Sequence, residues 1–138
     1  MSSKKRVLIL CTGNSARSQM AEGLLRQMAG DQFEIYSAGT NPKGMHPQTV
    51  IAMKEIGIDV SGQRSKDVEE FKGQKFDYVI TVCDRAKQNC PIFPGAEPIH
   101  WGFEDPADAP PEKKERTFTA VRDEIKRRLN LFLLSQRQ

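Results

Sequence analysis

The sequence predicts an α/β fold: a single domain, residues 1–138, in which a four-stranded parallel sheet has helices on both faces. Two observations support this prediction. Residues 6–10 and 33–39 are strand candidates separated by an amphipathic helix candidate, an order that favours a parallel pair with a right-handed crossover. The length of 138 residues is also typical of one domain with one core.

The first helix is predicted over residues 15–28, because apolar side chains recur there at helical spacing and Gly30 follows them. A second helix is predicted to begin at Pro47, since proline suits the first helical turn, and to end near Gly57. A short helix is expected at residues 68–71. These segments continue the alternation of helices and strands.

The second half of the chain follows the same pattern. We predict a third strand over residues 76–83, a short helix over residues 84–89 and a short fourth strand over residues 98–103. Residues 104–114 are expected to form a loop before a long helix that ends near Leu134. The apolar stripe of that helix consists of Phe118, Val121, Ile125, Leu129 and either Phe132 or Leu133.

Charge and hydropathy exclude several classes of protein. The net charge of +3 is mild and the basic residues are interleaved with acidic ones, so a nucleic-acid partner is not predicted. No run of apolar residues reaches the length of a secretory signal or a membrane span. We therefore expect a cytoplasmic protein, without a membrane partner and with reduced thiols. No long exposed apolar stripe is predicted, which favours a monomer.

The three cysteines, Cys11, Cys83 and Cys90, do not suggest a structural framework. Their number is odd, which argues against a set of disulfides in a cytoplasmic chain. The C-x2-C spacing of common metal sites is absent, and His46 and His100 are isolated. The sequence thus predicts neither a metal nor a cofactor. His46 is interpreted as a loop residue that leads into the second helix.

The segment "CTGNSAR" predicts an anion site, because Cys11 ends a strand and Arg17 lies six residues later at the start of a helix. Small residues allow the loop to curl with its N–H groups inward, and unpaired N–H groups at the helix start add to them. Arg17 can donate hydrogen bonds to two oxygens of a tetrahedral anion. The candidate binding residues are Thr12, Gly13, Asn14, Ser15, Ala16, Arg17 and Ser18.

The same surroundings are expected to lower the pKa of the Cys11 thiol, because a helix N-terminus and a guanidinium both stabilise a thiolate. Ser18 is a further candidate donor to the sulfur. The residues alone leave an alternative open, namely a strand-to-helix turn around a buried structural cysteine.

Asp105 is a further candidate site residue. Pro106 constrains it to a non-helical conformation, which makes it a fixed loop carboxylate. Neither Glu104 nor Asp108 precedes a proline. On the residues alone, a solvated turn aspartate is the alternative.

The segment "CTGNSARSQMAEG" resembles the active-site loop of the low-molecular-weight tyrosine phosphatase superfamily, and more narrowly the arsenate reductases built on that fold. The segments "YSAG", "AMKEIGID", "VCDRAKQNCP" and "HWGFEDPA" match the same reductases in the same order, over nearly the whole chain. The resemblance implies that Cys11 is the nucleophile, with Asp105 as general acid. It also implies arsenate as substrate, with phosphate or sulfate as mimics, and thioredoxin as the reductant.

The resemblance further implies a relay in which Cys83 attacks Cys11 and Cys90 then attacks Cys83. If residues 84–89 are helical, the Cα atoms of Cys83 and Cys90 lie about 10 Å apart. A disulfide requires roughly 4.4–6.8 Å, so the segment must unwind. A helix this short is marginally stable, and unwinding it is therefore easy.

Three functions remain open at this stage. A tyrosine phosphatase of the same family requires only Cys11, and the aromatic residue that commonly follows the Asp-Pro in such phosphatases is absent here. A redox sensor that binds oxyanions is the third alternative, and a glutaredoxin is an alternative reductant.

Some relatives bind an alkali cation near the loop, but Lys66 occupies the acidic position of that site, so no metal is predicted.

Overall fold

The computed structural model describes residues 4–82 and 93–136, so Cys83, Cys90 and the helix expected at residues 84–89 lie outside the described residues. Its four strands are β1 (Lys5–Cys11), β2 (Phe33–Gly39), β3 (Tyr78–Thr81) and β4 (Glu97–His100). They form one sheet in the order β2-β1-β3-β4, and all three pairs are parallel. The predicted four-stranded parallel sheet is confirmed.

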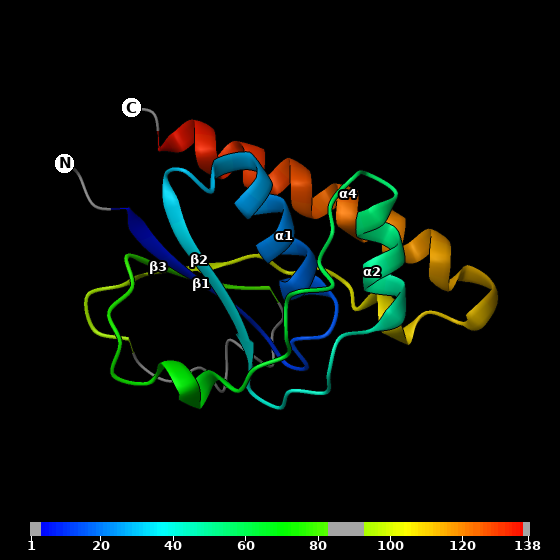
Figure 1. Cartoon of the computed structure of the whole chain (residues 1–138), viewed down its shortest axis with the longest axis horizontal. Helices are drawn as coiled ribbons and strands as arrows, with labels where there is room; N and C mark the ends of the chain where they lie inside the picture. The colour runs from blue at the N-terminus through cyan, green and yellow to red at the C-terminus, as the bar shows by residue number, and fades with distance from the viewer. Residues whose placement is uncertain (1–3, 83–92, 137–138) are drawn as a thin grey trace.

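Three α-helices and two short 3-10 helices complete the described chain. The α-helices are α1 (Arg17–Ala29), α2 (Pro47–Lys54) and α4 (Pro111–Ser135), and the 3-10 helices are η1 (Val68–Phe71) and η2 (Pro106–Asp108). Helices α1 and α4 pack together on one face of the sheet, whereas η1 lies on the opposite face (Figure 1). Helices therefore cover both faces, as the alternation of elements predicts.

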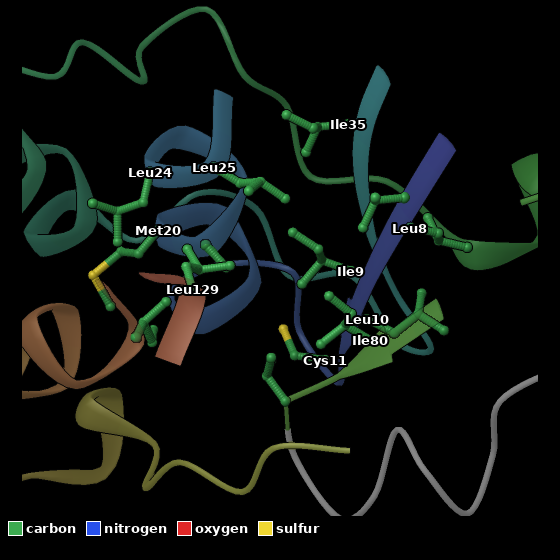
Figure 2. Packing of buried hydrophobic residues seen from close by; sticks show 14 of the residues in the cluster. Leu8, Ile9, Leu10, Cys11, Met20, Leu24, Leu25, Ile35, Ile80 and Leu129 are labelled. Atoms are coloured by element: carbon green, nitrogen blue, oxygen red, sulfur yellow. The ribbon is translucent and has the colours of Figure 1, made fainter. Parts of the chain in front are cut away.

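The main core lies between the sheet and the α1–α4 layer. Strand β1 is central in the sheet, and Val7 to Leu10 are completely buried. Figure 2 shows Ile9 facing Leu25 of α1, with Leu129 of α4 close by. The predicted stripe of α4 is buried here, with Phe132 rather than Leu133 as its last fully enclosed member.

An aromatic cluster covers the other face. The ring of Tyr36, which alternation along β2 directs away from α1, lies 5.5 Å from Phe71 and 5.9 Å from Phe76. Phe93 packs edge-on against Phe76 at 5.6 Å. The Arg6 guanidinium lies 4.6 Å from the Phe76 ring and closes the cluster toward solvent. Helix η1 is thus held by ring packing.

Two boundaries differ clearly from the prediction. Strand β4 ends at His100, whereas the sequence reading extends it to residue 103. Helix α4 begins at Pro111, whereas the sequence reading extends the loop to Lys114. A proline at the first helical position loses no hydrogen bond, because the first N–H groups of a helix have no partner within it. Pro110 and Pro111 therefore stand at a helix start. Among the described residues, no helix has both the length and the apolar content that a membrane span requires.

Candidate active site

The loop between β1 and α1 is held from outside by its carbonyl groups. The backbone N–H groups of Thr40, Asn41, Lys43 and His46 donate to the carbonyls of Cys11, Thr12, Gly13 and Ser15, at 2.9–3.2 Å. The remaining carbonyl, that of Asn14, accepts from the Gln19 side chain at 3.0 Å. Every carbonyl from Cys11 to Ser15 therefore has a partner outside the loop.

This outward pattern determines where the N–H groups point. In a planar trans peptide unit the N–H and C=O groups point in opposite directions, so the N–H groups that follow these carbonyls are turned inward. The Asn14 N–H donates to the Cys11 sulfur at 3.2 Å, which shows the inward direction directly. Asn14 itself has a positive φ of 46°, a conformation that asparagine tolerates better than most residues. The loop is a cradle of N–H donors, as expected of an anion site.

Cys11 lies at the bottom of this cradle and is only 2% exposed. A chain of hydrogen bonds sets its surroundings: Ser37 donates to Glu22 at 2.5 Å, and the Asn14 amide donates to Ser37 at 3.0 Å and to Ser18 at 2.8 Å. Because the Ser18 oxygen already accepts from Asn14, its own proton is available to the Cys11 sulfur, 2.9 Å away. The predicted donor role of Ser18 agrees with this geometry.

The expected lowering of the Cys11 pKa is wrong for this structure. Burial raises the pKa of the Cys11 thiol above its ordinary value, and it outweighs the lowering effects of the Ser18 hydrogen bonds, the Arg17 charge and the Asn14 N–H. The sequence shows the charged and polar neighbours of the thiol, but not that the protein encloses it completely. Burial therefore favours the thiol over the thiolate at Cys11.

Arg17 joins the loop to the candidate acid. Its Nη2 atom lies 3.4 Å from Oδ2 of Asp105, and its Nη1 atom donates to the Phe103 carbonyl at 3.0 Å. Asp105 has an extended backbone conformation and caps η2 by accepting from the Ala107 N–H at 3.0 Å. The predicted fixed carboxylate before Pro106 is therefore present, and it meets Arg17 across the site.

The site opens into a cavity of about 610 Å³. Of the candidate residues, seven line it: Cys11, Thr12, Gly13, Ser15, Ala16, Arg17 and Asp105. Asn14 and Ser18 do not line it, because both are fully buried behind the loop and act on it through hydrogen bonds. The segment before α2 and helix η2 supply the remaining walls, namely Lys43, Gly44, Met45, His46, Pro47, Ala107 and Asp108.

Lys66 is the residue that the resemblance places at the acidic position of an alkali-cation site. Its ammonium is 3.8 Å from Oε1 of Glu22, and its backbone N–H donates to the Asn14 side chain at 2.8 Å. Burial lowers the pKa of the Lys66 ammonium, and the Glu22 carboxylate acts in the opposite direction. The Lys66 ammonium thus lies beside Glu22, which Ser37 and, through Ser37, Asn14 join by hydrogen bonds.

Several residues that shape the loop were missed by sequence reasoning. The Thr49 hydroxyl donates to the Ser15 carbonyl at 2.8 Å, and Gln19 is fully buried against the loop. Gly39 lies so close that a Cβ atom there would be 2.5 Å from the Thr12 carbonyl oxygen. Gly39 belongs to the quoted "YSAG" segment, but the residues around Thr49 give no comparable signal.

We expect Gly39→Ala to destabilise the protein by about 1–3 kcal/mol, because the added methyl group meets backbone atoms that cannot move without opening the loop. Urea unfolding measures this change. Gly62→Ala is the matched control: a Cβ atom there meets nothing within 4 Å, so its effect should stay within about 0.5 kcal/mol. Equal stabilities of the two variants would contradict the proposed close approach.

A parallel α/β sheet with a cysteine at the bottom of an N–H cradle, and with an arginine and an aspartate paired at its edge, is the arrangement expected of a cysteine-dependent oxyanion-binding protein. Comparison with protein-family models agrees. Residues 6–137 match the low molecular weight phosphotyrosine protein phosphatase model, and the chain belongs to this family.

Relatives within the family carry a more specific name. An arsenate reductase of Halalkalibacterium halodurans is 48% identical over 132 residues, which cover 94% of this chain and 95% of the relative. A solved structure described as an arsenate reductase in the oxidized state has a TM-score of 0.82 and 31% identity, and the match covers 95% of this chain and 98% of the other. A thioredoxin-dependent arsenate reductase of Corynebacterium glutamicum has a TM-score of 0.74 and 29% identity, with 97% of this chain and 64% of the other covered.

Proposed function

We propose that this protein reduces arsenate to arsenite, with Cys11 as nucleophile and with Cys83 and then Cys90 as resolving thiols. The observation that carries the proposal is the position of Cys11 at the bottom of a cradle of N–H donors, with Arg17 and Asp105 at its opening. A tetrahedral oxyanion in this cradle lies directly above the sulfur. The names of the relatives support arsenate as the anion.

The first step joins sulfur to arsenic. The loop N–H groups and Arg17 hold three oxygens of arsenate, and the bound charge draws Arg17 away from Asp105. Once the anion has drawn Arg17 away, the Cys11 thiol passes its proton to the Asp105 carboxylate. The Cys11 thiolate then forms a bond to arsenic while the bond between arsenic and a hydroxyl group breaks, and Asp105 gives that proton to the departing hydroxyl, which leaves as water. Arsenic remains As(V) in the resulting Cys11 adduct.

The second step supplies the two electrons. The Cys83 thiolate attacks the Cys11 sulfur, the S–As bond breaks, and its electron pair stays on arsenic, which leaves as As(III) in arsenite. The product is a Cys11–Cys83 disulfide. Cys90 then attacks Cys83, which frees Cys11 and moves the disulfide to Cys83–Cys90. An external dithiol, for which we propose thioredoxin, reduces this disulfide and completes the cycle.

The described residues support an encounter between Cys11 and Cys83. Val82, the residue before Cys83, donates its backbone N–H to the carbonyl of Leu10, the residue before Cys11, at 2.9 Å. Strands β1 and β3 are neighbours in the sheet and end at the same edge. Cys83 and Cys90 themselves lie outside the described residues. The described chain before Cys83 therefore ends beside the residue that precedes Cys11.

The proposed partner and cellular location follow from the same chemistry. Thioredoxin is named for the Corynebacterium glutamicum neighbour, which supports a thioredoxin-type reductant here. A relay that ends in a thiol–disulfide exchange requires a reducing compartment, which we propose to be the cytoplasm. We further propose that a single domain acts as a monomer.

A phosphatase is the second candidate, and the family to which the chain belongs favours it. The cavity is less suited to this role, because none of the described residues that line it has a phenyl, phenol or indole ring to pack on a phosphotyrosine. A phosphatase requires water instead of Cys83 to release the product from Cys11. The fate of the adduct on Cys11 therefore separates the two functions.

We expect Cys90→Ser to release about one equivalent of arsenite and to stop as a Cys11–Cys83 disulfide, because the last thiol of the relay is missing. Cys83→Ser should stop earlier, with arsenic still on Cys11. The measurement is arsenite release with thioredoxin, thioredoxin reductase and NADPH, followed by peptide mapping of the disulfides. The wild-type protein, which should turn over many times, is the reference, and a parallel assay with glutaredoxin tests the alternative reductant.

Three outcomes distinguish the alternatives. Many turnovers by Cys90→Ser with thioredoxin alone would refute the relay. Efficient hydrolysis of an aryl phosphate without reductant, combined with no arsenite production, would identify a phosphatase. A protein that forms the disulfide but turns over neither substrate would be a sensor.

A further inference from the structure

We propose that His46 is an additional binding residue of the cavity, and that its imidazole N–H selects an unsubstituted oxyanion over one whose outward oxygen is replaced by carbon. This inference rests on the proposed function, because it specifies the substrate of the same site. The residues before α2 form one wall of the cavity, which Asp105 also lines. His46 is the wall residue whose hydrogen bonds define the direction of its ring.

The tautomer of His46 follows from its role as N-cap of α2. Its Nδ1 atom accepts a hydrogen bond from the Gln48 backbone N–H at 3.0 Å, so Nδ1 carries no proton. Burial, and to a lesser degree the Lys114 ammonium, lowers the pKa of His46, against the opposing effect of Asp105. The ring is therefore neutral, and its one proton is on Nε2.

The position of the ring directs Nε2 to the cavity. The ring packs on the buried Phe118 at a centroid distance of 4.9 Å, and its Nδ1 edge is turned to the start of α2. Among the described residues, no buried side-chain nitrogen or oxygen lacks a partner, and Nε2 has none there, so Nε2 is open to solvent. Since His46 lines the cavity, we infer that this open edge faces an anion bound there.

A tetrahedral anion in the loop has one oxygen that the loop does not reach. Three oxygens face the inward N–H groups and Arg17, whereas the fourth points away from Cys11 toward Asp105 and the opening of the cavity. In arsenate or phosphate this oxygen accepts a hydrogen bond from Nε2–H. In a phosphonate a carbon atom stands at the same place and accepts none.

His46 also helps to hold the loop, because its backbone N–H donates to the Ser15 carbonyl at 3.0 Å. A test must separate this backbone role from the imidazole. His46→Asn does so: asparagine is a preferred N-cap and keeps the backbone N–H, but it lacks the Nε2–H donor. His46→Ala removes both the cap and the donor and shows the size of the capping effect.

The experiment is calorimetric titration of the reduced protein with inorganic phosphate and with methylphosphonate, at a pH where both are dianions. We expect His46→Asn to weaken phosphate binding about tenfold or more, as for the loss of a hydrogen bond to a charged group, and methylphosphonate binding less than about threefold. Lys43→Gln is the control for charge alone, because the exposed Lys43 ammonium should attract both dianions alike.

The outcomes do not depend on arsenate reduction. If His46→Asn weakens the binding of phosphate and of methylphosphonate equally, His46 only positions the loop. If the phosphate affinity is unchanged, His46 binds no anion. Either result overturns the proposal. A second measurement uses the wild type: phosphate, but not methylphosphonate, should shift the nitrogen resonance of His46 Nε2. If binding follows the prediction while arsenite production fails, the proposed reduction is wrong and the anion site stands.

Discussion

Replacing Cys11 with serine is expected to reduce arsenate turnover to background. The thiol supplies both the nucleophile and one of the two sulfurs that become a disulfide, and a hydroxyl group serves as neither. The sulfur is held by the Ser18 hydroxyl at 2.9 Å and the Asn14 N–H at 3.2 Å. A serine oxygen accepts the same hydrogen bonds, so the loop should keep its shape. Arsenite formation in the coupled assay measures the loss.

The control for this variant is anion binding. The loop N–H groups and Arg17 are unchanged in Cys11→Ser, so phosphate should bind within a few-fold of the wild-type affinity. Activity above a few per cent of wild type would remove Cys11 from its proposed role. Loss of phosphate binding together with activity would instead indicate that serine has disrupted the loop.

The cradle could be predicted from the sequence because its chemistry is contiguous. Cys11 and Arg17 are separated by five small residues, and the strand and helix that flank them are recognisable from their apolar patterns. The position of Asp105 opposite Arg17 was a different kind of prediction, since 88 positions separate the two residues and only the family resemblance related them. Parallel strands place both segments at one edge of the sheet.

Other properties of the site depend on packing that no local pattern shows. The pKa of Cys11 is raised because the fold encloses the sulfur, which the seven residues of the motif do not reveal. Thr49 and His46 act on the loop from a segment about 30 positions away. The sequence alone indicates only a loop residue at His46, before the second helix, and gives Thr49 no role.

The second large effect is expected for Asp105→Asn, which should slow formation of the Cys11–arsenic adduct by about 10²–10⁴-fold. Asparagine keeps the cap of η2, because its side-chain oxygen accepts from the Ala107 N–H as the carboxylate does. It has no proton to give to the departing oxygen. Since it also frees Arg17 from an ion pair of 3.4 Å, phosphate binding should be retained or strengthened.

Single-turnover kinetics test this prediction, with arsenate in excess over enzyme and quenching before arsenite is released. Glu104→Gln is the matched control: it removes the neighbouring exposed carboxylate, which does not line the cavity, and should change the rate less than about twofold. If Asp105→Asn forms the adduct at the wild-type rate, another group donates the proton. If both variants lose the same fraction of the rate, the summed negative charge of this segment, and not proton transfer from Asp105, is responsible.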